Sequence, residues 1–130
     1  MTTAALNLET DFVVITPAMQ AKTIAVTPTI YAQLDAEFNQ FNDHQLVSIY
    51  SFDRDWPSWE IHPHGDEVVV LISGHCTMLL ETADGIVSTT LSASGDFVVV
   101  SKNTWHTAHT ATPTKMLFIT PGEGTQNRDC

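Results

Sequence analysis

The sequence predicts an all-β fold with one short N-terminal helix. Between residues 46 and 120, short apolar segments in which polarity alternates with a period of two are separated by turn residues. Eight such segments at nearly regular spacing are typical of a β-sandwich or barrel. The chain has 130 residues, of which 43% are hydrophobic, and this suffices for a single modest core. We therefore expect one domain over residues 1–130, with the barrel at about 45–120.

The helix is expected at about residues 28–40, within an N-terminal extension to the barrel. Ile30, Leu34 and Phe38 are spaced four residues apart, which places them on one face of a helix. Thr27 and Pro28 fit the cap and the first helical position. The segment 39–44, NQFNDH, breaks the pattern and should end the helix.

The eight expected strands follow this helix in chain order. They are Leu46–Phe52, Trp59–His64, Glu67–Ser73, Cys76–Thr82, Ile86–Leu91, Phe97–Ser101, His106–Thr110 and Lys115–Thr120. The segments between them contain residues that favour turns, and Asp84-Gly85 is the strongest hairpin signal among them.

Charge excludes two classes of partner. Five Lys and Arg residues stand against fifteen Asp and Glu residues, for a formal net charge of −10. The five cations, at positions 22, 54, 102, 115 and 128, form no stripe along the chain. Such a surface repels phosphate backbones and anionic lipids, so we expect no nucleic-acid or membrane partner. The longest apolar runs, at 68–72 and 97–100, are also far shorter than the roughly 20 residues of a membrane span.

The cellular compartment is predicted from the N-terminus and the cysteines. The N-terminal segment MTTAALNLETDF has neither a basic flank nor a long apolar core, so it does not resemble a secretory signal. The two cysteines, Cys76 in an apolar segment and Cys130 at the end, do not form a disulfide framework. These observations favour the cytoplasm.

Four of the six histidines fall into two clusters, HPHGDE at 62–67 and WHTAH at 105–109. Residues i and i+2 of a strand share a face, so His62 and His64 should project together, with Glu67 opening the next strand. If His106 comes from a facing strand, three imidazoles and one carboxylate meet at one point. This donor set suits Fe, Mn, Ni, Cu or Zn better than Ca or Mg, and a six-coordinate ion would keep two positions open for a ligand.

The two clusters resemble the motifs of small, single-domain bacterial cupins of unassigned function. The first cupin motif, His-x-His-x3-4-Glu-x6-Gly, is similar to HPHGDEVVVLISG at 62–74. The second, Gly-x5-Pro-x-Gly-x2-His-x3-Asn, is similar to GDFVVVSKNTWHTAHT at 95–110. The resemblance implies a double-stranded β-helix, also called a jelly-roll barrel, and a homodimer. It also implies a divalent transition metal ion held by His62, His64, Glu67 and His106.

Two departures from these motifs bear on the site. Only two residues separate His64 from Glu67, where the motif has three or four, so the shorter turn could tilt Glu67 away or shift ligation to Asp66. Asn103 stands where the second motif has glycine. Asparagine is the non-glycine residue that best tolerates a left-handed backbone, so the fold should keep this turn.

Two functions remain open at this point. The first is a metal-dependent enzyme of the oxygenase, isomerase or lyase type that acts on a small polar or carboxylated molecule, although no catalytic residue stands out. The alternative is a non-catalytic cupin that serves as a small-ligand or metal sensor. On a simpler interpretation, His62 and His64 merely flank a turn and Glu67 is a solvated carboxylate at the start of a strand.

Overall fold

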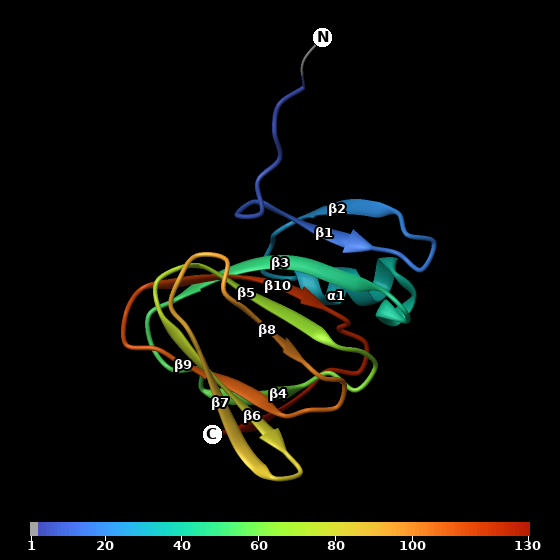
Figure 1. Ribbon diagram of the computed structural model, residues 1–130. Coiled ribbons are helices and arrows are strands. Elements are labelled where there is room, and N and C mark those ends of the chain that lie inside the picture. Colours follow the sequence, from blue (N-terminus) through green and yellow to red (C-terminus); the bar gives the residue numbers. More distant parts are fainter. Residues whose placement is uncertain (1–2) are drawn as a thin grey trace.

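The computed structural model describes residues 3–130, which form two antiparallel β-sheets and one α-helix (Figure 1). The strands are β1 (Asp11–Ile15), β2 (Ala21–Ala25), β3 (Gln45–Phe52), β4 (Ser58–Ile61), β5 (Glu67–Ser73), β6 (Cys76–Thr82), β7 (Gly85–Leu91), β8 (Phe97–Val100), β9 (His106–His109), β10 (Thr114–Thr120) and β11 (Gln126–Asp129). Sheet A has the strand order β2-β1-β3-β10-β5-β8, and sheet B has the order β11-β4-β9-β6-β7. The expectation of a mostly β chain is confirmed.

The main core lies between the two sheets. Val69 of β5 and Met116 of β10 come from sheet A and are completely buried. Met78 of β6 and Ala108 of β9 come from sheet B and are equally inaccessible. These residues belong to one hydrophobic cluster, so the inner faces of the sheets pack against each other as the period-two pattern requires.

The helix is shorter than the sequence predicts. Helix α1 spans Ile30–Glu37 and is followed by a 3-10 turn, Asn39–Phe41. It begins after Thr29, two residues later than expected, and the Thr29 side chain makes no capping hydrogen bond. Ile30 and Leu34 are buried as predicted, in a second hydrophobic cluster that also contains Phe12 of β1. This cluster holds α1 against the β1–β3 end of sheet A.

The eight predicted strands correspond to β3–β10, and three further strands lie outside the predicted barrel. Strands β1 and β2 extend sheet A, where Val14 pairs with Leu46 of β3. Strand β11 pairs along the whole of β4, from Gln126 opposite Ile61 to Asp129 opposite Ser58. Because β1 and β2 pair within sheet A, the N-terminal extension is part of that sheet.

Two local features decide the geometry near the predicted site. Strand β4 ends at Ile61, three residues before the expected end, and the chain then turns through Pro63 and His64. The rule that residues i and i+2 share a face therefore does not apply to His62 and His64. Asn103 has φ of 63°, which confirms the left-handed turn expected there.

Within residues 3–130, no helix has the length and apolar character needed to cross a membrane.

Candidate metal centre

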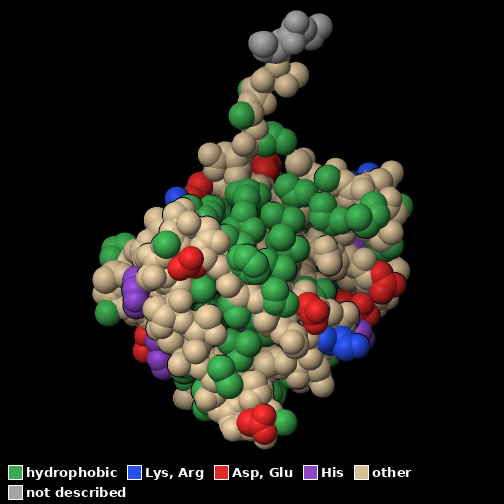
Figure 2. Space-filling model, viewed as in Figure 1, with side chains coloured by type: hydrophobic (Ala, Val, Ile, Leu, Met, Phe, Trp, Pro, Cys, Tyr) green, Lys and Arg blue, Asp and Glu red, His purple; other side chains and the backbone are tan. Residues whose placement is uncertain are grey.

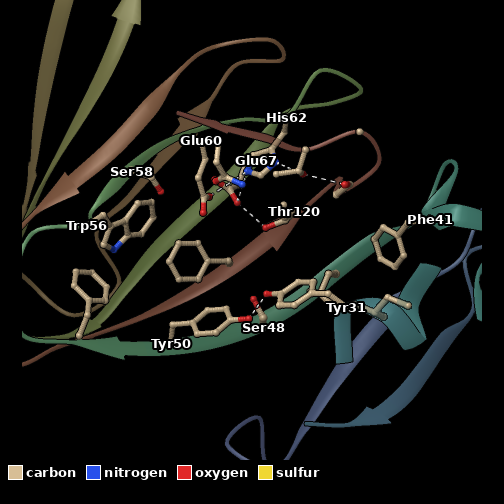
Figure 3. Close-up of a pocket in the computed structure, with 18 of the residues that line it drawn as sticks. Tyr31, Phe41, Ser48, Tyr50, Trp56, Ser58, Glu60, His62, Glu67 and Thr120 are labelled. Atoms are coloured by element: carbon tan, nitrogen blue, oxygen red, sulfur yellow. Dashed lines mark hydrogen bonds and ion pairs between the residues drawn. The ribbon is translucent and has the colours of Figure 1, made fainter. Parts of the chain in front are cut away.

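Three of the predicted site residues, His62, Glu67 and His106, meet between the two sheets; Figure 3 shows the first two. His62 directly follows β4, and His106 opens β9, the strand that pairs with β4 through Glu60 opposite His106. Glu67 opens β5 in the other sheet. The site is thus built from the ends of three strands, with donors from both sheets.

The distances show a tight cluster. His106 Nε2 lies 3.1 Å from Glu67 Oε1, and His62 Nε2 lies 3.3 Å from Glu67 Oε2. All three residues are buried, with exposed fractions of 0% for His106, 2% for Glu67 and 5% for His62. The simpler interpretation of Glu67 as a solvated carboxylate is therefore wrong.

A fourth donor is Glu60, which the sequence analysis did not select. Its Oε2 atom lies 3.8 Å from His62 Nε2 and 4.0 Å from His106 Nε2. One ligand atom from each of these three residues falls within 4.8 Å of the others. The Glu60 side chain is 35% exposed, so this donor forms the open side of the cluster.

Hydrogen bonds on the far side of each imidazole fix its tautomer. The Thr125 hydroxyl donates to the carbonyl of Gly122 at 2.9 Å, so its oxygen accepts a hydrogen bond from His62 Nδ1 at 2.8 Å. His106 Nδ1 lies 3.0 Å from the carbonyl oxygen of Thr104, which can only accept. Both histidines therefore carry hydrogen on Nδ1 when neutral and present the Nε2 lone pair to the cluster.

The inward-facing atoms have unmet bonding capacity. Among buried side-chain atoms of residues 3–130, His62 Nε2, Glu67 Oε1 and His106 Nε2 lack a hydrogen-bond partner. The other oxygen of Glu67 accepts a hydrogen bond from the Thr120 hydroxyl at 2.6 Å. Buried polar atoms are rarely left unpaired, and two lone pairs that face a carboxylate repel it unless positive charge lies between them. A divalent transition metal ion fits this arrangement of nitrogen and oxygen donors.

Without a metal, protons supply that positive charge. Burial alone would raise the pKa of Glu67, but the adjacent His106 and His62 hold this pKa at about 2. Burial opposes charge on His106, yet Glu67 beside it raises the pKa of this histidine above its usual value. Burial, and then the charge of Glu67, raise the pKa of Glu60. Metal binding at His106 Nε2 would therefore compete with a proton there.

His64 and Asp66 lie outside the cluster. His64 Nε2 is 3.8 Å from Glu123 Oε2, and its side chain is 53% exposed. Asp66 is exposed and accepts a hydrogen bond from the backbone N–H of Lys102 at 2.7 Å, so it closes a turn. Because β4 ends at Ile61, the turn carries His64 away from the direction of His62.

The spacing of the motif contained a signal for Glu60. If the first motif is started two residues earlier, it reads Glu60-x-His62-x4-Glu67-x6-Gly74, which restores the expected four-residue gap before Glu67. Glu60 then stands in the position of the first histidine. With this alignment, the short gap noted in the sequence disappears.

A cavity of about 870 Å³ opens from the cluster toward helix α1. Glu60, His62 and Glu67 lie at one end of it, and Tyr31 and Leu34 of α1 contribute to the other. Figure 3 shows the side chains that point into this space. The cluster is thus accessible to a small molecule through the cavity.

Strand β11 fixes the strand that carries Glu60. The Arg128 guanidinium lies over two indole rings, 5.2 Å from the ring centre of Trp59 and 4.6 Å from that of Trp105, and it pairs with Glu81. Neither Trp59 nor Trp105 is among the described residues that line the cavity. This stack holds β11 on β4 from the side opposite the cluster.

No family model matches the chain. No curated protein matches it by sequence either. The structure is nevertheless similar to several solved structures. A cupin-2 domain protein from Shewanella frigidimarina shares 19% identity at a TM-score of 0.51, with 59% of this chain and 70% of that chain covered.

Two oxalate enzymes also match. An oxalate oxidase in complex with glycolate gives a TM-score of 0.55 at 14% identity, over 63% of this chain and 45% of that one. Bacillus subtilis oxalate decarboxylase, described with Mn(II) centres, gives 0.53 at 16% identity, over 65% of this chain and 23% of that one. The match spans less than half of either enzyme, and at these identities the similarity concerns the fold alone.

Proposed function

We propose that the two sheets of this chain form a jelly-roll barrel of the cupin type, and that the chain is a metal-binding protein with a small-molecule ligand. The ion is a divalent transition metal (Fe, Mn, Ni, Cu or Zn) held by Glu60, His62, Glu67 and His106. The observation that carries this proposal is the set of three buried, unpaired donor atoms that face one point. His64 is left out of the ligand set because it lies in the turn and is half-exposed.

The metal would act as a Lewis acid toward a ligand that enters through the cavity. Four protein donors leave two positions of a six-coordinate ion open, and the partly exposed side of Glu60 is where they would face the cavity. This supports a metal-dependent enzyme of the oxygenase, isomerase or lyase type. A sensor that binds its ligand at the metal without turnover is the second candidate. It is favoured because the one further carboxylate among the described lining residues, Asp35, lies on α1 and not beside the four donors.

Elemental analysis by plasma mass spectrometry tests the metal site. The untagged protein is compared with His106→Ala and with His109→Ala, a control on the same strand whose side chain is 48% exposed. We expect about one equivalent of a transition metal in the wild type and the control, and loss of most of it in His106→Ala. Absence of metal after each of the five ions has been offered, or equal metal in His106→Ala, would refute the proposal.

We also propose that the outer face of sheet A is the contact between two copies of the chain. Antiparallel sheets with a solvated face carry polar side chains there, whereas this face is apolar. Figure 2 shows hydrophobic side chains gathered in a broad band on this side of the molecule, over the region of β3, β5 and β8. By register and exposure the outward-facing residues are Val47, Val68, Val70, Phe97, Val99, Leu117 and Ile119.

Sedimentation velocity tests this contact with two matched variants. Phe97, 61% exposed on β8, lies within the apolar face, and Ile86, 60% exposed on β7, lies in the other sheet. We expect a dimer for the wild type and Ile86→Lys, and a monomer for Phe97→Lys, because a buried lysine without a partner strongly opposes association. If the wild type sediments as a monomer at two protein concentrations that differ 100-fold, the dimer is ruled out.

A further inference from the structure

The wall of the cavity is a continuous aromatic surface. The ring centre of Trp56 lies 5.7 Å from that of Phe52 and 5.9 Å from that of Phe118, and Phe118 in turn lies 5.9 Å from Tyr50. The same Trp56 lies 6.4 Å from the imidazole of His106. These rings are inclined to one another, so a flat apolar body that packs against the face or edge of one of them, such as Trp56, would lie close to the donor cluster.

The far end of the cavity, where α1 lies, presents two tyrosine hydroxyls. The hydroxyls of Tyr31 on α1 and Tyr50 on β3 hydrogen-bond to each other there (Figure 3). Burial raises the pKa of both phenols, so they remain protonated at neutral pH. This end offers hydroxyl groups as hydrogen-bond partners and no counterion for an anion.

Charge in the cavity disfavours an anionic ligand. No lysine or arginine is among the described residues that line it, whereas Asp35, Glu60 and Glu67 are. A divalent ion with two carboxylates and two neutral imidazoles carries no net charge. A carboxylate ligand would thus leave an uncompensated negative charge in a partly buried space, within a chain whose net charge is −10.

We propose that the cavity binds an uncharged molecule with a flat apolar body and an oxygen donor directed at the cluster. The inference rests on the proposed metal site for the role of that oxygen donor. It narrows the expectation of a small polar or carboxylated ligand, because it excludes the carboxylate. A cationic ligand lacks the lone pair needed to occupy an open position of the ion.

Three probes of nearly the same shape separate these charge classes. They are 2-naphthamide, 2-naphthoate and 2-naphthamidinium, which are neutral, anionic and cationic at pH 7.5. Binding to the full chain is measured by calorimetry and by two-dimensional NMR, with zinc-loaded and chelator-treated protein in parallel. We expect the amide to bind zinc-loaded protein at least about tenfold more tightly than either charged probe, since one unpaired charge in the cavity costs more than 1.4 kcal/mol.

Each outcome decides the question. Equal or tighter binding of the carboxylate would overturn the proposal, as would tightest binding of the amidinium. Absence of binding by all three at millimolar concentration would overturn it as well. Zinc stoichiometry is measured on the same samples, so a protein that binds no zinc but still prefers the amide refutes the metal site alone.

A variant with an added charge tests whether electrostatics determines the preference for the amide probe over the carboxylate probe. Ser58 lines the cavity on β4, two residues before Glu60 and on the same face of the strand. Ser58→Lys adds a cation there, and Ser58→Met adds a side chain of similar length without charge. We expect Ser58→Lys to shift the carboxylate-to-amide affinity ratio by about tenfold toward the carboxylate, and Ser58→Met to leave it unchanged. The same ratio in both variants would contradict the argument from charge.

Discussion

Replacing Glu60 should weaken metal binding far more than replacing His64, although both lie within the same motif segment. Glu60 Oε2 is within 4.0 Å of both histidine Nε2 atoms, whereas His64 points to Glu123 at the surface. The matched substitutions are Glu60→Gln, which keeps the shape and removes the charge, and His64→Gln, which removes the imidazole. They separate the ligand set seen in the structure from the set predicted from the sequence.

The size of the effect follows from the number of donors. Four-donor zinc sites bind with about 10–16 kcal/mol, or about 2.5–4 kcal/mol for each donor. The glutamine amide retains a weak oxygen donor, and Glu60 is 35% exposed. The loss of zinc-binding free energy should therefore lie at the lower end of this range. We expect the Kd for zinc to rise about 100-fold in Glu60→Gln. His64→Gln breaks only a half-exposed ion pair and should change the Kd by less than about twofold.

The assay is competition for zinc and cobalt against a chromophoric chelator, at fixed pH and with each variant checked for native circular dichroism. Cobalt adds a second readout, since its visible bands report the donor set. If His64→Gln weakens zinc binding as much as Glu60→Gln does, His64 binds the metal together with His62. The turn that contains His64 must then rearrange when the metal binds. If Glu60→Gln binds zinc as the wild type does, Glu60 is no ligand.

The other predictions concern residues around the cluster. Thr125→Val should raise the Kd for zinc about 10- to 100-fold, because it removes the acceptor that orients His62, while Thr125→Ser should not; the same competition assay measures both. In metal-free protein, the pKa of Glu67 is lowered to about 2, so its ionised form stabilises the fold above pH 4.5 and this stabilisation is lost as the pH falls toward 2. Urea unfolding should show a decrease on the order of 3 kcal/mol over that range, and Glu67→Gln should abolish this slope. Gly74→Ala should destabilise the fold more than Gly85→Ala in the same unfolding assay. Both glycines have positive φ, which costs alanine about 1–2 kcal/mol, but a Cβ at Gly74 would also lie 2.4 Å from a backbone oxygen while one at Gly85 meets nothing within 4 Å.

The central strands were predictable because their side chains alternate between a buried and an open face. In β5, for example, Glu67, Val69 and Leu71 are buried and the residues between them are partly exposed. Strand β11 could not be predicted this way, since its four residues, QNRD, are all exposed. It is a strand because its backbone pairs with β4 and because Arg128 stacks on two tryptophans, and a local pattern contains neither contact.

The sequence predicted that His62, Glu67 and His106 lie close together, but not that Glu60 lies beside them. His62, Glu67 and His106 come together as expected because they lie at strand ends that the two sheets bring face to face. The placement of His64 depended on where β4 ends, and strand ends are the least determined feature of a sequence pattern. Finding Glu60 from the sequence depended on how the first motif is aligned with the chain. The four-residue gap between His62 and Glu67 was the available clue.

The pairing of β11 with β4 also makes the cluster depend on a distant part of the chain. Strand β4 is in register with β9 at one position, Glu60 opposite His106, so most of its ladder comes from residues 126–129. Thr125, which orients His62, immediately precedes them. The donors lie between residues 60 and 106, yet the strand that ends just before His62 gains most of its backbone pairing from residues 126–129. The cluster therefore depends on a segment that contributes no donor to it, and a substitution in β11 can change the site without touching a ligand.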